Sequence, residues 1–386
     1  MQRAREEIYN YLVKQILQGD ISPNDPIPTE TRLAEMFRAN RMDARFAVRI
    51  LEQKGVVRRK KRQGTRLSRI PSPSLARDLT SALCREAHVI ATPGNDPIHW
   101  SHLTLQEMER TLKEDGYAMV LEGLPAGADR AGLEEMLERI AAKGAAALVL
   151  MPTLEETRLY LANLDLLYQY HSNIYVFDYG GTPPEKWPFH VLSLHPFGEG
   201  AQVAQYLYDS GFRRIAFLPQ EGMARVYWTQ QRELGLCYGL LRASNGSLRP
   251  ESWRLPSNGD EVCRRLAKAR GRYAVVAAND QHAAWLLDRA RRAGLEAPRD
   301  FSLVSFDNDP RFRSCNLTTV APPLARIGRM IAQLVSGKLL PKEDGNRLCV
   351  SVKSEIIERG TCQAAPTGPQ AADAKAGVRA NEACRN

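Results

Sequence analysis

Three arginines at helical spacing form the pattern with the clearest chemical potential in this 386-residue sequence. Arg41, Arg45 and Arg49 recur every four residues, so a helix over residues 40–54 would carry them on one face. Guanidinium groups are planar and permanently charged, and they suit bidentate hydrogen bonds to guanine edges or to phosphates. An ordinary surface helix with a stripe of arginines is the alternative interpretation.

A strongly basic segment follows this helix. Five consecutive cations run from Arg58 to Arg62, and Gln63 and Gly64 come next, between short strand-like runs at 56–57 and 65–67. This order predicts a β-hairpin in which Gly64 allows a tight turn or close backbone approach. Cations around such a tip meet phosphates or enter a minor groove.

Other short elements must position these groups. Ile8, Leu12 and Ile16 recur every four residues and predict a first helix. Thr29 can cap a second helix, and Asn40 can cap the helix that carries the arginines. Helices in this order, followed by a basic hairpin, predict a winged helix-turn-helix, which reads duplex DNA.

The distribution of charge supports this interpretation. Residues 1–68 hold 15 Lys and Arg against 8 Asp and Glu, a balance of +7, whereas the rest of the chain holds 38 against 36. A solvated basic surface would explain such an excess by itself. Its coincidence with a helix-turn-helix pattern makes a polyanion, double-stranded DNA, the better candidate partner.

The pattern changes after a Pro- and Ser-rich stretch at residues 70–74. From residue 86, short apolar runs alternate with helical patterns, which predicts an α/β domain with parallel sheets and helices on both faces. The alternation contains more strands than one open sheet usually holds, so two lobes are expected.

These patterns divide the chain. We expect a winged helix-turn-helix, a linker, a two-lobed domain and a disordered tail, at residues 1–68, 69–85, 86–362 and 363–386. Within the two-lobed domain, the expected segments are about 86–191 and 319–345 for the first lobe, and about 192–318 and 346–361 for the second.

Polar residues near the ends of the expected strands are candidates for a small-molecule site, because the carboxyl ends of parallel strands line one crevice. Asp178 and Asp280 each lie at the end of an apolar run, and the Asp280 carboxylate could accept two sugar hydroxyls. Trp100 could stack on the apolar face of a sugar. Asp280 and Asp307 could equally be helix caps, and Trp100 could be a core residue.

Several other classes of site find no support. The seven cysteines are scattered without a C-x-x-C pair, which argues against a disulfide framework and against a zinc site. No G-x-x-x-x-G-K-[ST] or G-x-S-x-G motif stands out, and no cofactor is expected. No long apolar run and no apolar leader is seen, so we expect no membrane span and a cytoplasmic location.

Residues 8–67 resemble the GntR-type winged helix. In that family a P-S-E motif opens the second helix, a V-S-R-x-T-V-R motif opens the recognition helix, and G-R-G-T forms the wing tip. Pro28-Thr29-Glu30 matches the first motif, Arg41 and Arg45 match the arginines of the second, and Gly64-Thr65 matches the end of the third.

Departures from the family motifs affect the expected operator sequence. Asn40 stands at the motif serine, Asp43 at the motif threonine, and Arg62-Gln63 at the usual Gly-Arg. Asp43 is an acceptor, so a cytosine amino group or an internal arginine is its expected partner. Pattern and resemblance together assign DNA contacts to Thr29, Arg32, Asn40, Arg41, Asp43, Arg45, Arg49, Arg62, Gln63 and Gly64.

Residues 86–361 resemble the ligand domain of LacI/GalR-type repressors, which shares the periplasmic sugar-binding fold. The matching segments lie at 211–218, 278–284, 294–308 and 317–320. Arg232, three residues before Gly235, matches the pocket arginine of that family. The resemblance implies an effector, expected to be a sugar, and the candidate effector-binding residues are Trp100, Asp178, Arg232, Asp280 and Asp307.

Together the two resemblances imply a ligand-responsive DNA-binding transcriptional regulator, expected to be a repressor and not an enzyme. A homodimer is expected, because two winged domains can span two half-sites. The alternative is an enzyme or ligand-binding α/β domain with an appended DNA-binding head. PLP-dependent fusions of this kind need an active-site lysine, and no convincing one is seen. A third alternative, a free sugar-binding protein, would need export, and no signal sequence is seen.

Overall fold

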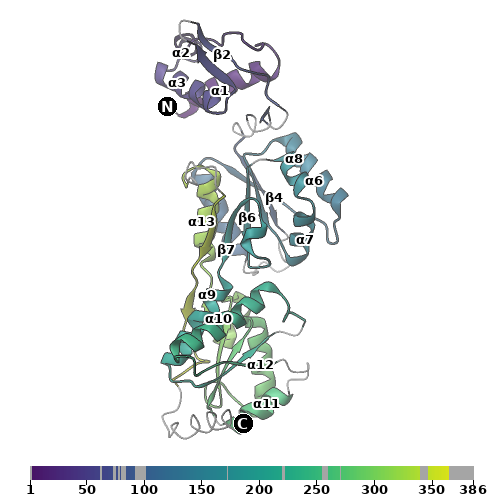
Figure 1. The fold of residues 1–386 in the computed structure, drawn as a ribbon, viewed down its shortest axis with the longest axis vertical. Helices are drawn as coiled ribbons and strands as arrows, with labels where there is room; N and C mark the ends of the chain where they lie inside the picture. The colour runs from purple at the N-terminus through teal and green to yellow at the C-terminus, as the bar shows by residue number, and fades with distance from the viewer. Residues whose placement is uncertain are drawn as a thin grey trace, which may run out of the picture.

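The computed structural model describes most of the chain, and the fold is drawn in Figure 1. The described residues are 2–60, 63–72, 75–76, 79, 84–91, 101–171, 173–219, 222–253, 260–269, 271–339 and 347–364. Figure 1 shows the N-terminal helices at one end of an elongated molecule, one α/β lobe in the middle and a second lobe at the other end.

The N-terminal domain is a small helical domain with a β-hairpin. Its elements are α1 (Gln2–Leu17), α2 (Glu30–Met36), α3 (Arg41–Gln53), β1 (Val57–Lys60) and β2 (Gly64–Leu67). Ile8, Leu12 and Ile16 are buried against Leu33 and Leu51, so the four-residue repeat of the first helix does face the core. Because α3 lies against both other helices, its opposite face is left for solvent or a partner.

Side-chain caps start the two helices of the helix-turn-helix, as their residue types predict. The Thr29 hydroxyl accepts a hydrogen bond from the backbone N–H of Arg32 at 3.2 Å. The side-chain oxygen of Asn40, Oδ1, accepts one from the backbone N–H of Asp43 at 2.8 Å. Each cap satisfies a backbone donor that the first helical turn leaves unpaired.

The hairpin pairs β1 with β2 in antiparallel register, and Lys60 lies opposite Gly64. Gly64 has a φ of +77°, a conformation that glycine adopts without steric cost. The predicted wing is therefore present, directly after α3.

The first lobe is a parallel sheet with helices on both faces, in the strand order β13-β7-β6-β5-β3-β4. One face packs on α5 and α13, and the other on α6, α7 and α8. The strands are β3 (Glu86–Ala91), β4 (Ala118–Glu122), β5 (Ala147–Met151), β6 (Ile174–Asp178), β7 (His190–Leu194) and β13 (Cys349–Val352). The helices are α5 (Ser101–Glu114), α6 (Arg130–Lys143), α7 (Leu154–Ala162), α8 (Leu164–Tyr170) and α13 (Leu324–Val335), and a 3₁₀ turn, η1, spans Pro184–Lys186.

The second lobe repeats this architecture, in the order β14-β12-β11-β10-β8-β9. Among the described strands of this lobe, β14 alone runs antiparallel to its neighbour. The strands are β8 (Arg214–Leu218), β9 (Glu251–Ser252), β10 (Tyr273–Ala277), β11 (Ser302–Phe306), β12 (Thr318–Ala321) and β14 (Glu355–Ile357). The helices are α9 (Pro196–Asp209), α10 (Tyr227–Ala243), α11 (Asp260–Ala269) and α12 (Asp280–Arg292), with the 3₁₀ turn η2 at Pro310–Cys315.

The chain passes between the lobes after β7, after β12 and between β13 and β14. These crossings differ from the expected segments at three places. Residues 192–194 were expected in the second lobe, but they belong to β7, and Leu192 lies opposite Phe177 of β6 in the first lobe. Residues 349–352 were expected in the second lobe, but β13 pairs with β7, and Cys349 lies opposite Val191. Residues 319–321 were expected in the first lobe, but β12 pairs with β11 of the second. A strand belongs to the sheet that pairs with it, so each expected boundary moves by a few residues.

None of the described helices combines the length and the apolar character that crossing a membrane would require.

Candidate functional site

The outer face of α3 carries the predicted arginines. Arg41, Arg45 and Arg49 are exposed, whereas Ala44 and Val48 on the opposite face are buried in the domain core. Arg41 lies near a single carboxylate, with 3.7 Å between its Nε and Glu30 Oε2. Among the described residues, Arg45 and Arg49 make no ion pair, so both guanidinium groups are free to bind an anion.

Asp43 does not lie on this outer face. It is buried, and its Oδ1 accepts a hydrogen bond of 2.5 Å from Arg5 Nε of α1. The Arg5 guanidinium also lies 5.1 Å from the centre of the Phe46 ring. Of the two partners expected for Asp43, the structure therefore shows the internal arginine, and Asp43 joins the first helix to the third.

The remaining DNA-contact candidates have different surroundings. Thr29 and Asn40 use their side-chain oxygens as helix caps. Arg32 is exposed and lies 3.5 Å from Glu35, and Gln63 is exposed at the hairpin. Arg62 lies outside the described residues. Contact of these residues with DNA stays a prediction.

Part of the basic segment ties the hairpin to the helices. Arg59 lies 3.1 Å from a carboxylate oxygen of Glu30 and 3.1 Å from one of Glu52. Arg58 donates a hydrogen bond of 2.7 Å to the Asn24 side chain. These arginines fix the position of the wing relative to α3, whereas Lys60 is exposed.

A cavity of about 260 Å³ lies between the two lobes. Loops at the carboxyl ends of strands from both sheets line it, as expected for this architecture. The first lobe contributes Thr153, Asp178 and Tyr179, and the second contributes Trp228, Arg232, Asn279, Asp307, Asp309 and Arg311.

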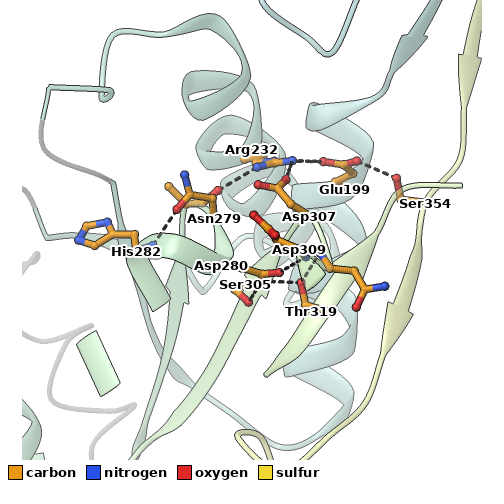
Figure 2. A network of polar contacts seen from close by, with 12 residues as sticks. Glu199, Arg232, Asn279, Asp280, His282, Ser305, Asp307, Asp309, Thr319 and Ser354 are labelled. Carbon is orange, nitrogen blue, oxygen red and sulfur yellow. Dashed lines mark hydrogen bonds and ion pairs between the residues drawn. The ribbon is translucent and has the colours of Figure 1, made fainter. Parts of the chain in front are cut away.

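Arg232 lies at the centre of the polar network beside this cavity (Figure 2). Its side chain is 5% exposed. It donates from Nε to Glu199 Oε2 at 3.0 Å, from Nη1 to the carbonyl oxygen of Ala278 at 2.9 Å, and from Nη2 to Asp307 Oδ1 at 2.8 Å. Burial opposes its charge, but the carboxylates of Asp307 and Glu199 hold its pKa above the ordinary value.

Glycines allow α10 to approach α9 closely enough to bury this arginine. A Cβ atom at Gly235 would come within 1.9 Å of the carbonyl oxygen of Phe197, and one at Gly200 within 2.1 Å of the carbonyl oxygen of Arg232. Glu199 also accepts a hydrogen bond of 2.7 Å from Ser354, which lies between β13 and β14 on the third crossing. The network thus connects the cavity to the hinge between the lobes.

Asp178 lines the cavity at the end of β6, but its oxygens are already occupied. Oδ1 accepts hydrogen bonds from the backbone N–H groups of Gly180 and Gly181, and Oδ2 accepts one of 2.8 Å from Trp187 Nε1. Burial raises the pKa of Asp178, although the hydrogen bonds from these donors act in the opposite direction. In this conformation Asp178 shapes a loop at the cavity wall and offers little free acceptor capacity.

Asp280 does not line the cavity, contrary to its predicted role as a direct ligand. Its Oδ1 accepts hydrogen bonds from the hydroxyls of Ser305 and Thr319, and its Oδ2 accepts one of 2.7 Å from the backbone N–H of Asp309. Burial, and next the charge of Asp307, raise the pKa of Asp280 to about 7. The neighbouring Asn279 caps α12 and lines the cavity instead.

Asp307 lies at the cavity, as predicted, on a turn with unusual backbone geometry. Its φ is +102°, and that of Asn308 is +49°. Asp309 and Arg311, which follow on η2, also line the cavity but were not predicted. The strand-end rule that selected Asp307 could have been extended to them. Trp100 lies outside the described residues, and Trp228 supplies the tryptophan of the described cavity wall.

Within the part of the chain that the structure describes, no group of His, Cys, Asp and Glu side chains is placed to hold a metal ion.

Comparison with known proteins identifies both domains. Residues 4–67 match the bacterial regulatory proteins of the gntR family, and residues 204–362 match the periplasmic binding protein-like domain. Both matches confirm the resemblances seen in the motifs.

Two known repressors align with most of this chain. The chain is 25% identical over 353 residues to the arabinose metabolism transcriptional repressor of Geobacillus stearothermophilus, which covers 86% of this chain and 89% of that protein. It is 25% identical over 304 residues to the transcriptional repressor PurR of Mannheimia succiniciproducens, covering 75% and 84%.

Solved structures share the fold. The transcriptional regulator CelR in complex with cellobiose superposes with a TM-score of 0.54 at 17% identity, over 87% of this chain and 100% of that one.

Proposed function

We propose that this chain, which joins a gntR-family winged helix to a periplasmic-binding-protein-like domain, is a transcriptional repressor whose DNA affinity responds to a small metabolite. One observation carries the proposal. A cavity between two hinged lobes, lined by charged, polar and aromatic side chains, lies on the same chain as a helix that presents Arg45 and Arg49 to solvent, and neither of these makes an ion pair with the described residues.

The DNA-binding part of the proposal rests on α3 and the wing. Arg45 and Arg49 can reach base edges or phosphates in a major groove, and Lys60 and Gln63 at the hairpin can reach the neighbouring backbone. The exposed cations make the affinity fall with rising salt, by about 0.9 in log–log slope for each phosphate neutralised.

A sugar is the effector class that the cavity suits best. Arg232 and Asn279 offer donors and Asp307 offers an acceptor, a combination that matches ring hydroxyls. Trp228 provides an aromatic face on the same wall. The arabinose repressor among the relatives and the cellobiose complex among the solved structures support the same class.

The response needs little energy. A coupling of about 1–3 kcal/mol between effector and operator changes the operator affinity about 5- to 150-fold. Closure of the two lobes on an effector would move the three crossings, and the change would reach the N-terminal domain through the first lobe, which lies between that domain and the second lobe (Figure 1). We propose a homodimer in the cytoplasm, because one winged domain buries little DNA surface and two can span an operator with two half-sites.

We propose no catalytic activity. The long relatives are named as regulators, and the cavity carboxylates of Asp178 and Asp309 accept hydrogen bonds from their own surroundings. An enzyme with a DNA-binding head has no observation in its favour in the described structure.

Two measurements on the full chain test the proposal. Selection from a genomic DNA library, followed by fluorescence anisotropy, should give a sequence-specific operator, and Arg45→Ala should bind that operator more weakly. A thermal-shift screen of pentoses, hexoses and disaccharides should raise the melting temperature for one class, and Asp307→Asn should weaken that shift. A chain that binds all DNA sequences equally, or that no metabolite stabilises, would not fit the proposal.

A further inference from the structure

The turn after β11 is held in a backbone conformation that side chains disfavour. Asp307 has a φ of +102° and Asn308 a φ of +49°, one after the other and with neither being glycine. Such conformations persist only where surrounding contacts hold them, and they gather at functional sites. The first residue of this turn, Asp307, carries the carboxylate that pairs with Arg232 beside the cavity.

The contacts that hold the turn converge on Asp280. One carboxylate accepts hydrogen bonds from the Ser305 hydroxyl before the turn, from the backbone N–H of Asp309 after it, and from Thr319 on the neighbouring strand (Figure 2). Thr319 in turn accepts a hydrogen bond of 3.3 Å from the backbone N–H of Asn308. Asp280 therefore spans the turn from one end to the other.

The position of Asp280 separates it from the residues that face the cavity. Its side chain is buried below them, at the first residue of α12, and Asn279, Asp307 and Asp309 form the lining above. The two oxygens of this one side chain accept from all three donors. No other described side chain bonds to both Ser305 and Asp309.

We propose that Asp280 is a positioning residue of the effector site, which holds the Ser305–Asp309 turn so that Asp307 and Asp309 face the cavity. This inference rests on the proposed function only in taking the cavity to be an effector site. The turn and its contacts are properties of the second lobe alone. Asp280 acts through Asp307 and Asp309 and does not touch the bound molecule.

Hydrogen exchange measured by mass spectrometry on the full chain tests this without a ligand. In Asp280→Ala, peptides that cover residues 303–312 should lose protection about tenfold, while peptides from β8 and from the first lobe keep theirs. Asp280→Asn should recover most of the protection, because the amide oxygen can accept from the Asp309 N–H and the hydroxyls of Ser305 and Thr319 can rotate to accept from its NH₂.

A matched control lies on the same helix. Asp288 is exposed on α12 and pairs with Arg292 at 2.8 Å, so Asp288→Ala should leave the turn unchanged. Where Asp280→Ala fails to fold, Ser305→Ala carries the test, because it removes one anchor of the carboxylate, and partial loss of protection is expected. Unchanged protection of residues 303–312, or a uniform loss across the second lobe, would overturn the proposal.

A second readout uses L-arabinose and D-ribose as probes in the thermal-shift assay. A sugar that stabilises the parent protein should bind Asp280→Ala at least about tenfold more weakly than it binds Asp280→Asn. Equal binding to both variants would contradict the positioning role. If neither probe nor any other sugar stabilises the parent, the proposed function fails, and the exchange result still decides the role of Asp280.

Discussion

Replacing Arg232 by methionine should destabilise the protein strongly. The side chain of Arg232 is 5% exposed and that of Glu199 is 3% exposed, so the change leaves at least one charge buried without its counter-ion. Removing one partner of a buried ion pair costs about 3–5 kcal/mol. Methionine is an unbranched apolar side chain, but it also removes the guanidinium group from over the rings of Trp228 and Phe306, which adds to the loss of the charge.

The exposure of the second partner sets the magnitude. The side chain of Asp307 is 32% exposed, so water can solvate much of its charge once Arg232 is gone. The cost therefore comes mainly from Glu199 and lies near the lower figure, about 3 kcal/mol. At about 2–4 °C for each kcal/mol, the melting temperature should fall by about 6–12 °C.

Differential scanning fluorimetry of the full chain measures this change. The double variant Arg232→Met with Glu199→Gln removes the buried charge as well, and should recover about half of the loss or more. Arg242→Met, at an exposed position on the same helix, should change the melting temperature by no more than about 2 °C. A single Arg232→Met variant as stable as this control, or a double variant no better than the single one, would refute the reasoning.

Three further predictions follow from particular contacts. Arg45→Ala should weaken operator binding by about 1–3 kcal/mol with an unchanged melting temperature, since Arg45 makes no ion pair in the described protein; a normal anisotropy titration would contradict this. Gly235→Ala should lower the melting temperature, because its Cβ would lie 1.9 Å from the Phe197 carbonyl oxygen, and overpacking costs about 1–3 kcal/mol; an unchanged melting curve would show that the helices separate freely. The pKa of Asp280 is raised from 3.8 to about 7, so the stability that its protonation gives is present below pH 3.8 and lost as the pH rises through 7. Asp280→Asn escapes this loss, and its melting temperature relative to the parent should rise between pH 5 and 8; a constant difference would mean that Asp280 titrates normally.

Most of the fold could be predicted because local patterns determine it. Alternating apolar runs and helical patterns indicate parallel sheets with two-sided cover, and the caps at Thr29 and Asn40 follow from their residue types. The lobe of residues 349–352 could not be predicted in this way. That strand is short and half exposed, and its sheet depends on which edge is free at that point of the chain.

The cavity was predicted less completely than the fold. Arg232, Asp178 and Asp307 do line it, but Asp280, which was predicted as a direct ligand, does not, and the neighbouring Asn279 does. Both end the same strand, and the residue that faces the cavity depends on where α12 begins and on how the turn after β11 packs beneath it. Such packing comes from residues distant in sequence and leaves no local signal.

The hydrogen bond between Ser354 and Glu199 bears on how the two halves can rotate. Ser354 stands on the last connecting segment, and its partner carboxylate is enclosed and shared with a guanidinium group at the cavity. A rotation of one lobe against the other must therefore either move the Glu199 carboxylate together with Ser354 or break this hydrogen bond. Breaking it would leave a buried carboxylate without one of its donors. Opening and closing of the lobes then requires a discrete exchange of hydrogen-bond partners. This favours two distinct conformations over a continuous range of intermediate ones.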